Sequence, residues 1–264
     1  MSQVDTMSQY HSSDAVYVLG VRVDRLAQRQ ALDSIEQMIA QWRTSDHKQP
    51  CRQVVTVNPE FVMVAQHNKD FLTAINAAAL VVADGMGVVW ATRYIGRPAP
   101  ERVTGTDLLP DLARRCAAAG YRLYLLGAAA GVAEAASARL QELAPRLEIA
   151  GTYAGSPARE EEEEIIERVR AANADVLCVA YGAPAQELWI WRNLERLPVA
   201  VAMGVGGAYD FLAGRQHRAP AFVRNMGLEW LYRLYREPWR WRRMLALPRF
   251  AVRVVLRGRN KYDA

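Results

Sequence analysis

Several residues that follow apolar stretches have the types and spacing that catalysis or ligand binding needs. Asp84 follows Leu-Val-Val-Ala and precedes Gly85 and Gly87, where the missing side chains let a ligand approach the backbone closely. A partly desolvated carboxylate at the mouth of a cleft could take a proton from a substrate hydroxyl as a general base. The alternative is structural, because an aspartate before a helix also caps its N-terminus. The local pattern leaves both interpretations open.

Thr56 and Asn58 alternate along one strand-like stretch, so their side chains point to the same face. Both could exchange hydrogen bonds with a polar ligand in a cleft. The structural alternative for Asn58 is that it only prepares the turn into Pro59. The pattern therefore makes the two residues candidates for the same site without deciding their role.

Glycine-rich loops indicate a nucleotide or phosphate site only weakly. Gly127 and Gly131 follow a strand-like run and open a helix-like one, where a dinucleotide-binding fold has its phosphate loop. Neither their spacing nor Gly204-Val-Gly206-Gly207 completes the GxGxxG pattern. The sequence also lacks GxxxxGK[ST], HExxH and Asp-x-Asp, and its 4 histidines are dispersed. We therefore expect neither a metal site nor a cofactor.

The elements that must position these residues are short β-branched runs alternating with longer helical stretches. A strand pair is expected over 16–23, followed by strands at 53–57, 80–83, 121–126, 147–153, 176–180 and 199–203. Helices are expected at 25–42, 59–66, 71–78, 106–119, 131–143, 157–172 and 184–194. Strands separated by helical crossovers form a parallel sheet with helices on both faces. The predicted fold class is thus α/β and Rossmann-like.

Ligands bind to such sheets beyond the carboxyl ends of the strands. Five loops at predicted strand ends carry glycine and polar residues instead of ordinary turn chemistry: 56–60, 84–87, 127–131, 181–187 and 204–210. Because these loops share one edge of the sheet, the sequence predicts a single site there.

Charge is distributed unevenly along the 264 residues. Residues 215–264 hold twelve arginines and one lysine against three acidic residues, a net charge of +10, which leaves −5 for residues 1–214 out of the total of +5. We expect a flexible polar arm at 1–15, an α/β catalytic domain at 16–214 and a basic, Trp-rich appendage at 215–264. Three dispersed cysteines and the lack of a signal segment favour a reducing cytoplasm.

The basic appendage has the pattern of helices that lie at a membrane interface. Trp230, Leu231 and Leu234 recur at helical spacing, with arginines toward other faces, and the stretch after Pro238 repeats the combination. Arginines near anionic lipid contribute about 1 kcal/mol each. Two alternatives are helices docked on the body and a nucleic-acid surface; the acidic body disfavours the second. No uncharged apolar window is long enough to span a bilayer.

In these motifs, and in their order, the sequence resembles the WecG/TagA/CpsF glycosyltransferases, glycosyltransferase family 26. The resemblance covers about residues 16–249 and rests on these motifs: Thr56-Val-Asn58-Pro-Glu60, Asp84-Gly-Met-Gly87, Arg102-Val-Thr-Gly105-Thr-Asp107, Leu-Leu-Gly127, Gly182-Ala-Pro-Ala-Gln186-Glu187, Gly204-Val-Gly-Gly207-Ala-Tyr-Asp210, Arg218-Ala-Pro220 and Gly227-Leu-Glu229-Trp230-Leu-Tyr-Arg233-Leu. It implies a metal-independent, inverting transferase. The implied reaction moves a sugar from a UDP-sugar to a polyprenyl-diphosphate-linked saccharide at the cytoplasmic face of the inner membrane.

The resemblance also implies roles for single positions. Asp84 matches the proposed catalytic base, and Thr56, Asn58 and Gln186 match residues of the same catalytic pocket. The implied substrate-binding residues are Arg102, Gly85, Gly127, Gly204, Gly207, Asp210, Arg233, Arg240 and Arg243. The last three would complete the site over the lipid diphosphate.

The chemistry of inversion agrees with these roles. One base must deprotonate the acceptor hydroxyl, and positive groups must stabilise the departing UDP. Without Asp-x-Asp, that second task would fall on arginines, helix N-termini and glycine-loop amides. The donor is expected to be UDP-N-acetylmannosamine or UDP-glucose, and the acceptor an undecaprenyl-diphosphate-linked sugar in surface or exopolysaccharide biosynthesis.

Two other functions remain open from the sequence: a nucleotide-dependent oxidoreductase, disfavoured by the missing GxGxxG, and a non-catalytic peripheral membrane adaptor. No nucleic-acid partner is expected. Apolar surface on a detached appendage would favour self-association into a homo-oligomer when lipid is absent.

Overall fold

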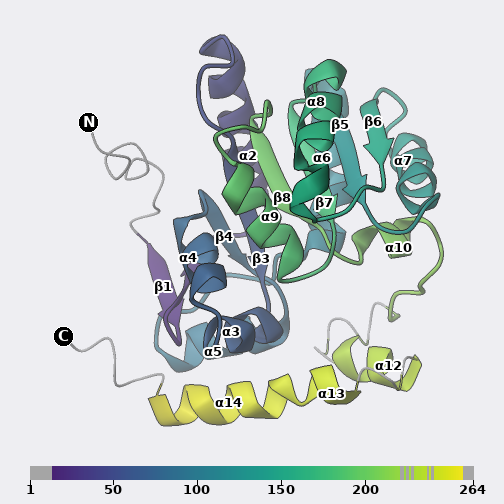
Figure 1. The fold of residues 1–264 in the computed structure, drawn as a ribbon. Helices are drawn as coiled ribbons and strands as arrows, with labels where there is room; N and C mark the ends of the chain where they lie inside the picture. The colour runs from purple at the N-terminus through teal and green to yellow at the C-terminus, as the bar shows by residue number, and fades with distance from the viewer. Residues whose placement is uncertain are drawn as a thin grey trace.

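A computed structural model describes residues 14–220, 223, 226, 229–236, 238 and 241–257, without the side chains of 233, 242 and 243. In this part of the chain a six-stranded parallel sheet has the order β4-β3-β8-β7-β5-β6, and β1 and β2 form a separate antiparallel hairpin (Figure 1). The strands are β1 Ala15–Val18, β2 Val21–Asp24, β3 Arg52–Val57, β4 Leu80–Ala83, β5 Arg122–Gly127, β6 Glu148–Tyr153, β7 Val176–Ala180 and β8 Val201–Gly204. The predicted α/β class is confirmed.

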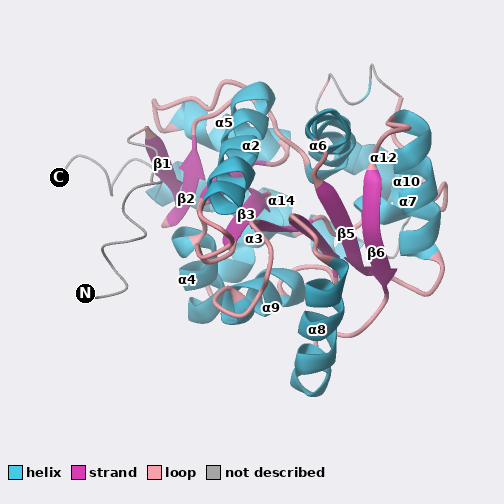
Figure 2. Ribbon diagram, turned by 90° about the horizontal axis from the view of Figure 1, so that it is seen from above, coloured by secondary structure: helices cyan, strands magenta, loops and turns pink. Residues whose placement is uncertain are grey.

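Helices cover both faces of the sheet (Figure 2). The helices are α2 Gln28–Thr44, α3 Pro59–Ala65, α4 Lys69–Ala77, α5 Met86–Tyr94, α6 Gly105–Ala119, α7 Val132–Leu143, α8 Glu162–Ala172, α9 Ala185–Asn193, α10 Ala208–Leu212, α12 Glu229–Arg236, α13 Trp241–Met244 and α14 Ala246–Arg257. On one face α2, α6 and α7 form a core with the sheet, and α4, α8 and α9 cover the other. This arrangement explains why β7, Val-Leu-Cys-Val-Ala, is buried along its whole length.

The hairpin is fastened to the sheet by a buried ion pair. The Arg22 guanidinium and the Asp24 carboxylate lie 3.0 Å apart, both almost fully buried. Asp24 Oδ2 also accepts a hydrogen bond from the Val81 N–H of β4 at 2.8 Å. The two opposite charges therefore compensate each other, and the bond from Val81 positions β2 beside the edge strand β4. Ala15, which we predicted to end the N-terminal arm, already belongs to β1, and residues 1–13 lie outside the described range.

Two helices differ from the sequence prediction because tertiary burial outweighs local preference. The stretch that becomes α5 is rich in β-branched and aromatic residues, which form helices less readily; we expected a loop over 84–87 and no element over the rest of it. Val88, Val89, Ala91 and Thr92 are buried in the helix, and this packing stabilises it. The short α10 likewise buries Ala208 and Tyr209. Both helices begin directly after a strand-end loop.

The last helix returns to the body. α14 packs against α3 and α5, with Phe250 and Val254 buried in the same core as those helices. Figure 1 shows it along the lower edge of the molecule, beneath both helices. No helix in the described part of the chain is long and apolar enough to cross a bilayer.

Candidate functional site

A cavity of about 590 Å³ lies at the carboxyl edge of the sheet, where the loops after β3, β4, β7 and β8 meet α12, α13 and α14. The predicted residues that line it are Thr56, Asn58, Asp84, Gly85, Arg102, Gln186, Gly204 and Gly207. Parallel strands place their carboxyl ends together, which is why residues as far apart in the sequence as Thr56 and Gly207 share one cavity. Four of the five loops expected to form a single site thus line this cavity, and the loop 127–131 does not.

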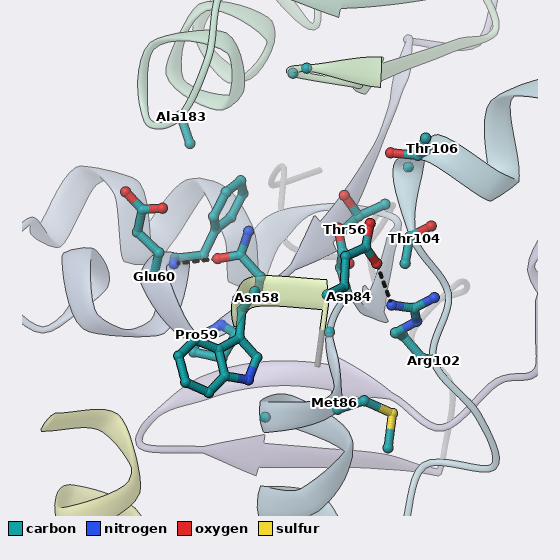
Figure 3. Close-up of a pocket in the computed structure, with 18 of the residues that line it drawn as sticks. Thr56, Asn58, Pro59, Glu60, Asp84, Met86, Arg102, Thr104, Thr106 and Ala183 are labelled. Carbon is teal, nitrogen blue, oxygen red and sulfur yellow. Dashed lines mark hydrogen bonds and ion pairs between the residues drawn. The ribbon is translucent and has the colours of Figure 1, made fainter. Parts of the chain in front are cut away.

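The backbone around Asp84 is held by its neighbours. Its N–H donates to the Val57 carbonyl at 2.7 Å, and the Val103 N–H donates to the Ala83 carbonyl at 2.8 Å. Gly85, with φ of 92°, is the N-cap residue of α5, which begins at Met86. Asp84 is therefore not the N-cap of this helix. Figure 3 shows its half-buried carboxylate facing the Arg102 guanidinium inside the cavity.

Asn58 has two roles at once. Its Oδ1 accepts a hydrogen bond from the Phe61 N–H at 3.0 Å and thereby caps α3, which begins at Pro59. The oxygen already accepts one hydrogen bond, and both side-chain amide hydrogens are groups that Asn58 can offer to a ligand. Thr56 is buried at the end of the same strand and lines the cavity with its hydroxyl toward Gly105. The pair meets in one cavity, as the alternation predicted.

Two arginines in the cavity are held by carboxylates. Arg102 Nη1 donates to Glu229 Oε2 at 2.9 Å, which links the body to α12. Arg218 binds Asp107 through both nitrogens, at 2.6 and 3.0 Å. Burial opposes ionisation of Asp107, but hydrogen bonds from Arg218 and Thr104 outweigh it and hold the pKa of Asp107 below its ordinary value. Carboxylates therefore hold both guanidinium groups in position beside the cavity.

Arg218 was not among the site residues predicted from the sequence. The signal was present, because Arg218-Ala-Pro220 belongs to the motifs of the resemblance. The residue stands near the start of a strongly basic segment, where no local pattern separates one arginine from another. Its contact with Asp107, which lies 111 positions earlier, is what marks it.

Gln186 lies at the junction of two loops. Its Oε1 accepts hydrogen bonds from the Gly182 N–H at 3.0 Å and the Gly206 N–H at 3.2 Å. Its Nε2 donates to Glu187 Oε1 at 2.7 Å. The side chain lines the cavity, yet its oxygen and one amide hydrogen are already used inside the protein. These contacts assign Gln186 to holding the loops in shape.

An apolar wall closes one side of the cavity. It is formed by Met86 and Trp90 of α5 together with Met244, Leu247 and Phe250 of the C-terminal helices. Met86 and Trp90 are about two-fifths exposed, while Phe250 is buried. Asp84, the two arginines and the glycine loops also line the cavity. The cavity therefore offers both charged and apolar contacts to a ligand. No local pattern in the sequence indicates this wall, because residues of α5 and α14 come together only in the folded chain.

Five predicted substrate-binding residues are not brought into the cavity by the described part of the chain. Gly127 ends β5 with φ of 98°, and a Cβ there would lie 2.8 Å from the Ala180 carbonyl carbon, so its lack of a side chain serves the packing of β5 against β7. Asp210 lies in α10 and is not among the residues that line the cavity. Arg233 and Arg243 belong to α12 and α13, but their side chains lie outside the described residues, as does the whole of Arg240. Their roles stay predictions.

The fold and this site define an α/β protein with a mixed polar and apolar cleft at the carboxyl edge of a parallel sheet. The family model described as "Glycosyl transferase WecG/TagA/CpsF family" matches residues 16–264. The chain belongs to the WecG/TagA/CpsF family of glycosyltransferases, which confirms the resemblance seen in its motifs.

Three curated relatives are similar over most of their length. Each is an N-acetylglucosaminyldiphosphoundecaprenol N-acetyl-beta-D-mannosaminyltransferase. The protein of Bacillus spizizenii is 35% identical over 202 residues, which cover 76% of this chain and 78% of the relative. The protein of Bacillus subtilis is 32% identical over 208 residues, 79% and 80% of the two chains. The protein of Staphylococcus aureus strain MW2 is 30% identical over 250 residues, 95% and 96%.

Proposed function

We propose that this protein transfers a sugar, with inversion, from a UDP-sugar to an undecaprenyl-diphosphate-linked sugar in bacterial polysaccharide biosynthesis. The names of the relatives favour N-acetylmannosamine as the sugar and N-acetylglucosaminyl-diphospho-undecaprenol as the acceptor. The observation that carries the proposal is the Asp84 carboxylate facing Arg102, in a cavity lined by both charged and apolar side chains. Family membership favours this activity over an oxidoreductase or a non-catalytic adaptor.

The proposed step is a single displacement. The acceptor hydroxyl oxygen forms a bond to C1 of the donor sugar as the bond from C1 to the β-phosphate oxygen breaks, and UDP departs with the electron pair. The Asp84 carboxylate takes the proton of the hydroxyl. General-base assistance of this kind contributes about 10²- to 10⁴-fold to the rate.

Charge that develops on the departing UDP needs fixed positive groups. Arg102 and Arg218 are the described cations that line the cavity, and both are positioned by carboxylates before any substrate arrives. Thr56 and the amide hydrogens of Asn58 would orient the sugar hydroxyls. We assign the glycine loops around Gly182 and Gly206 to the donor.

The apolar wall gives the acceptor lipid a place. Met86, Trp90 and Leu247 would contact the first isoprenoid units of the acceptor. A cavity lined by both charged and apolar side chains thus suits a substrate in which a diphosphate is bonded directly to a lipid.

Peripheral binding to the cytoplasmic face of the membrane is supported by the outer surface of α12–α14. This surface exposes large apolar side chains beside arginines: Leu231, Tyr235, Trp241, Leu245, Val252, Val255 and Leu256, with Arg236, Arg249 and Arg257. Apolar burial in the interface and attraction to anionic lipid would act together.

Transfer by the full chain tests the activity. Purified protein is incubated with UDP-N-acetylmannosamine or UDP-glucose and a synthetic N-acetylglucosaminyl-diphosphate lipid, and the product is measured by mass spectrometry. We expect transfer with the first donor, and at least a hundredfold loss of kcat in Asp84→Asn with lipid binding kept. Asp70→Asn, an exposed carboxylate of α4, is the matched control. Asp84→Asn with wild-type turnover would refute the proposed base.

A further inference from the structure

Gln186 ties together two loops that come from neighbouring strands. Gly182 follows β7 and Gly206 follows β8, and the single oxygen of the Gln186 side chain accepts a hydrogen bond from both of their N–H groups. This arrangement requires one orientation of the amide. If the amide flipped, its NH₂ group would face two N–H donors, and both would be left unsatisfied in a buried place.

The next residue decides that orientation. Glu187 Oε1 accepts the Gln186 Nε2 hydrogen at 2.7 Å, so the nitrogen is directed away from the loops. The fit is close: a Cβ placed on Gly204 would lie 2.4 Å from both Gln186 Nε2 and Glu187 Oε1. The main-chain carbonyl of Glu187 is held in turn by Gln53 Nε2 at 3.1 Å. The side chains of both Gln186 and Glu187 are almost fully buried.

The Glu187 carboxyl group is unusual because it is buried without a cation beside it among the residues that the structure describes. Its Oε2 is buried and has no hydrogen-bond partner in the described part of the chain, and no salt bridge of the described residues includes it. Burial raises its pKa to about 7, although the hydrogen bond from Gln186 lowers it. A buried carboxylate without a cation is costly, whereas a neutral carboxyl keeps one acceptor and gains one donor.

We propose that Glu187 is a positioning residue for the donor-binding loops: in its neutral form, with the proton on Oε2, it holds the Gln186 amide in the orientation that ties Gly182 to Gly206. This inference rests on the proposed function, because it assigns those loops to the UDP part of the donor. It gives Gln186, for which the resemblance implied a catalytic role, a supporting one. Neither residue would touch the reacting atoms.

Four variants of the full chain test the proposal through the Kd of UDP by calorimetry and the kcat and KM for the UDP-sugar. Glu187→Met keeps the length of the side chain but removes the acceptor; we expect the Kd and KM to rise at least tenfold while kcat changes less than threefold. Glu187→Gln keeps a neutral acceptor, and its Kd should stay within threefold of wild type. Gln186→Met should match Glu187→Met. The double variant should be little worse than either, because both act through one contact.

Asn193→Ala is the control for simple loss of stability. Asn193 is buried on the same helix, and its Nδ2 donates to the Trp189 carbonyl at 2.9 Å, outside the loops and the cavity. We expect a lower Tm with an unchanged Kd for UDP.

The outcomes distinguish failure of the proposed function from failure of the proposed role of Glu187. A wild-type protein that neither binds UDP nor transfers sugar would overturn the proposed function, and this inference with it. A wild-type protein that binds UDP, beside a Glu187→Met variant with the same Kd, would overturn the inference alone. A Glu187→Gln variant as weak as Glu187→Met would also overturn it, because the charged form would then be the one required. If Glu187→Met fails to fold, Gln186→Met and Glu187→Gln still decide the matter.

Discussion

Arg102 and Glu229 connect the body of the protein to its C-terminal helices across the cavity. Their Nη1 and Oε2 atoms lie 2.9 Å apart, and both side chains are largely buried, with exposed fractions of 18% and 14%. Both residues also line the cavity. The arginine that we assign to the substrate phosphates is thus partly neutralised by the segment that we assign to the membrane.

Removing that carboxylate should strengthen binding of a free nucleotide. In Glu229→Gln we expect the Kd of UDP, measured without lipid, to fall about fivefold, which corresponds to roughly 1 kcal/mol for a partly buried pair. Glu142→Gln, an exposed carboxylate on α7 and far along the chain from the cavity, serves as the control. An unchanged or raised Kd would show that Glu229 does not compete with phosphate for Arg102.

The bond between Asp107 and Arg218 should contribute to stability at neutral pH and lose its effect in acid. Asp107 has a lowered pKa, so its contribution is complete above its ordinary value of 3.8 and disappears as the pH falls through the lower value of the folded state. Thermal unfolding of wild type and Asp107→Asn between pH 7 and pH 2.5 measures this. We expect the two Tm curves to converge at the acid end. Parallel curves would contradict the prediction.

Glu187 should give stability the opposite dependence on pH. An acid whose folded pKa is raised to about 7 from 4.5 binds its proton more tightly in the folded state. Its effect on folding is therefore neutral below about pH 4, becomes more unfavourable as the pH rises from 4.5 to about 7, and is constant above that. Glu187→Gln has no ionisable group at this position and avoids the penalty. The Tm of the variant minus the Tm of wild type should therefore increase between pH 5 and pH 8. A constant difference across that range would show that Glu187 is charged in the folded protein.

Gly127 and Gly131 both have a positive φ, but substitution by alanine should destabilise the protein more at Gly127 than at Gly131. Gly127→Ala would place its Cβ 2.8 Å from the Ala180 backbone, which forces β5 and β7 apart, and we expect a loss of at least 3 kcal/mol, within the range of severe core overpacking. Gly131→Ala meets no atom within 4 Å and should cost only about 1 kcal/mol for its φ of 80°. Chemical denaturation measures both. Similar losses would mean that backbone strain alone determines them.

The sequence predicted the parallel sheet well because its strands are short, apolar and separated by helices. The expected bounds of β4 and β7 agree with the structure at both ends. Asp84, Thr56, Asn58 and Gln186 could be grouped because each lies at or beyond the carboxyl end of a strand and because the carboxyl ends of parallel strands must meet. This is a consequence of topology, which the alternation of elements already indicates.

The rest depended on contacts between distant segments. Nothing near Glu187 indicates that its carboxyl group lacks a cation, and nothing near Arg218 indicates its bond to Asp107. The α5 helix was missed because its β-branched residues disfavour a helix until the core buries them. The apolar wall required α14 to return to α3 and α5, a placement that no local pattern contains.

That return has a mechanical consequence. α14 rests on α3, which starts at the residue after Asn58, and on α5, which starts two residues after Asp84. A displacement of α14 would therefore move α3 and α5, and with them Asn58 and Asp84 beside the first turns of these helices. Binding of α12–α14 to a membrane surface would then be coupled to the alignment of the reacting groups, because the same displacement of α14 changes both.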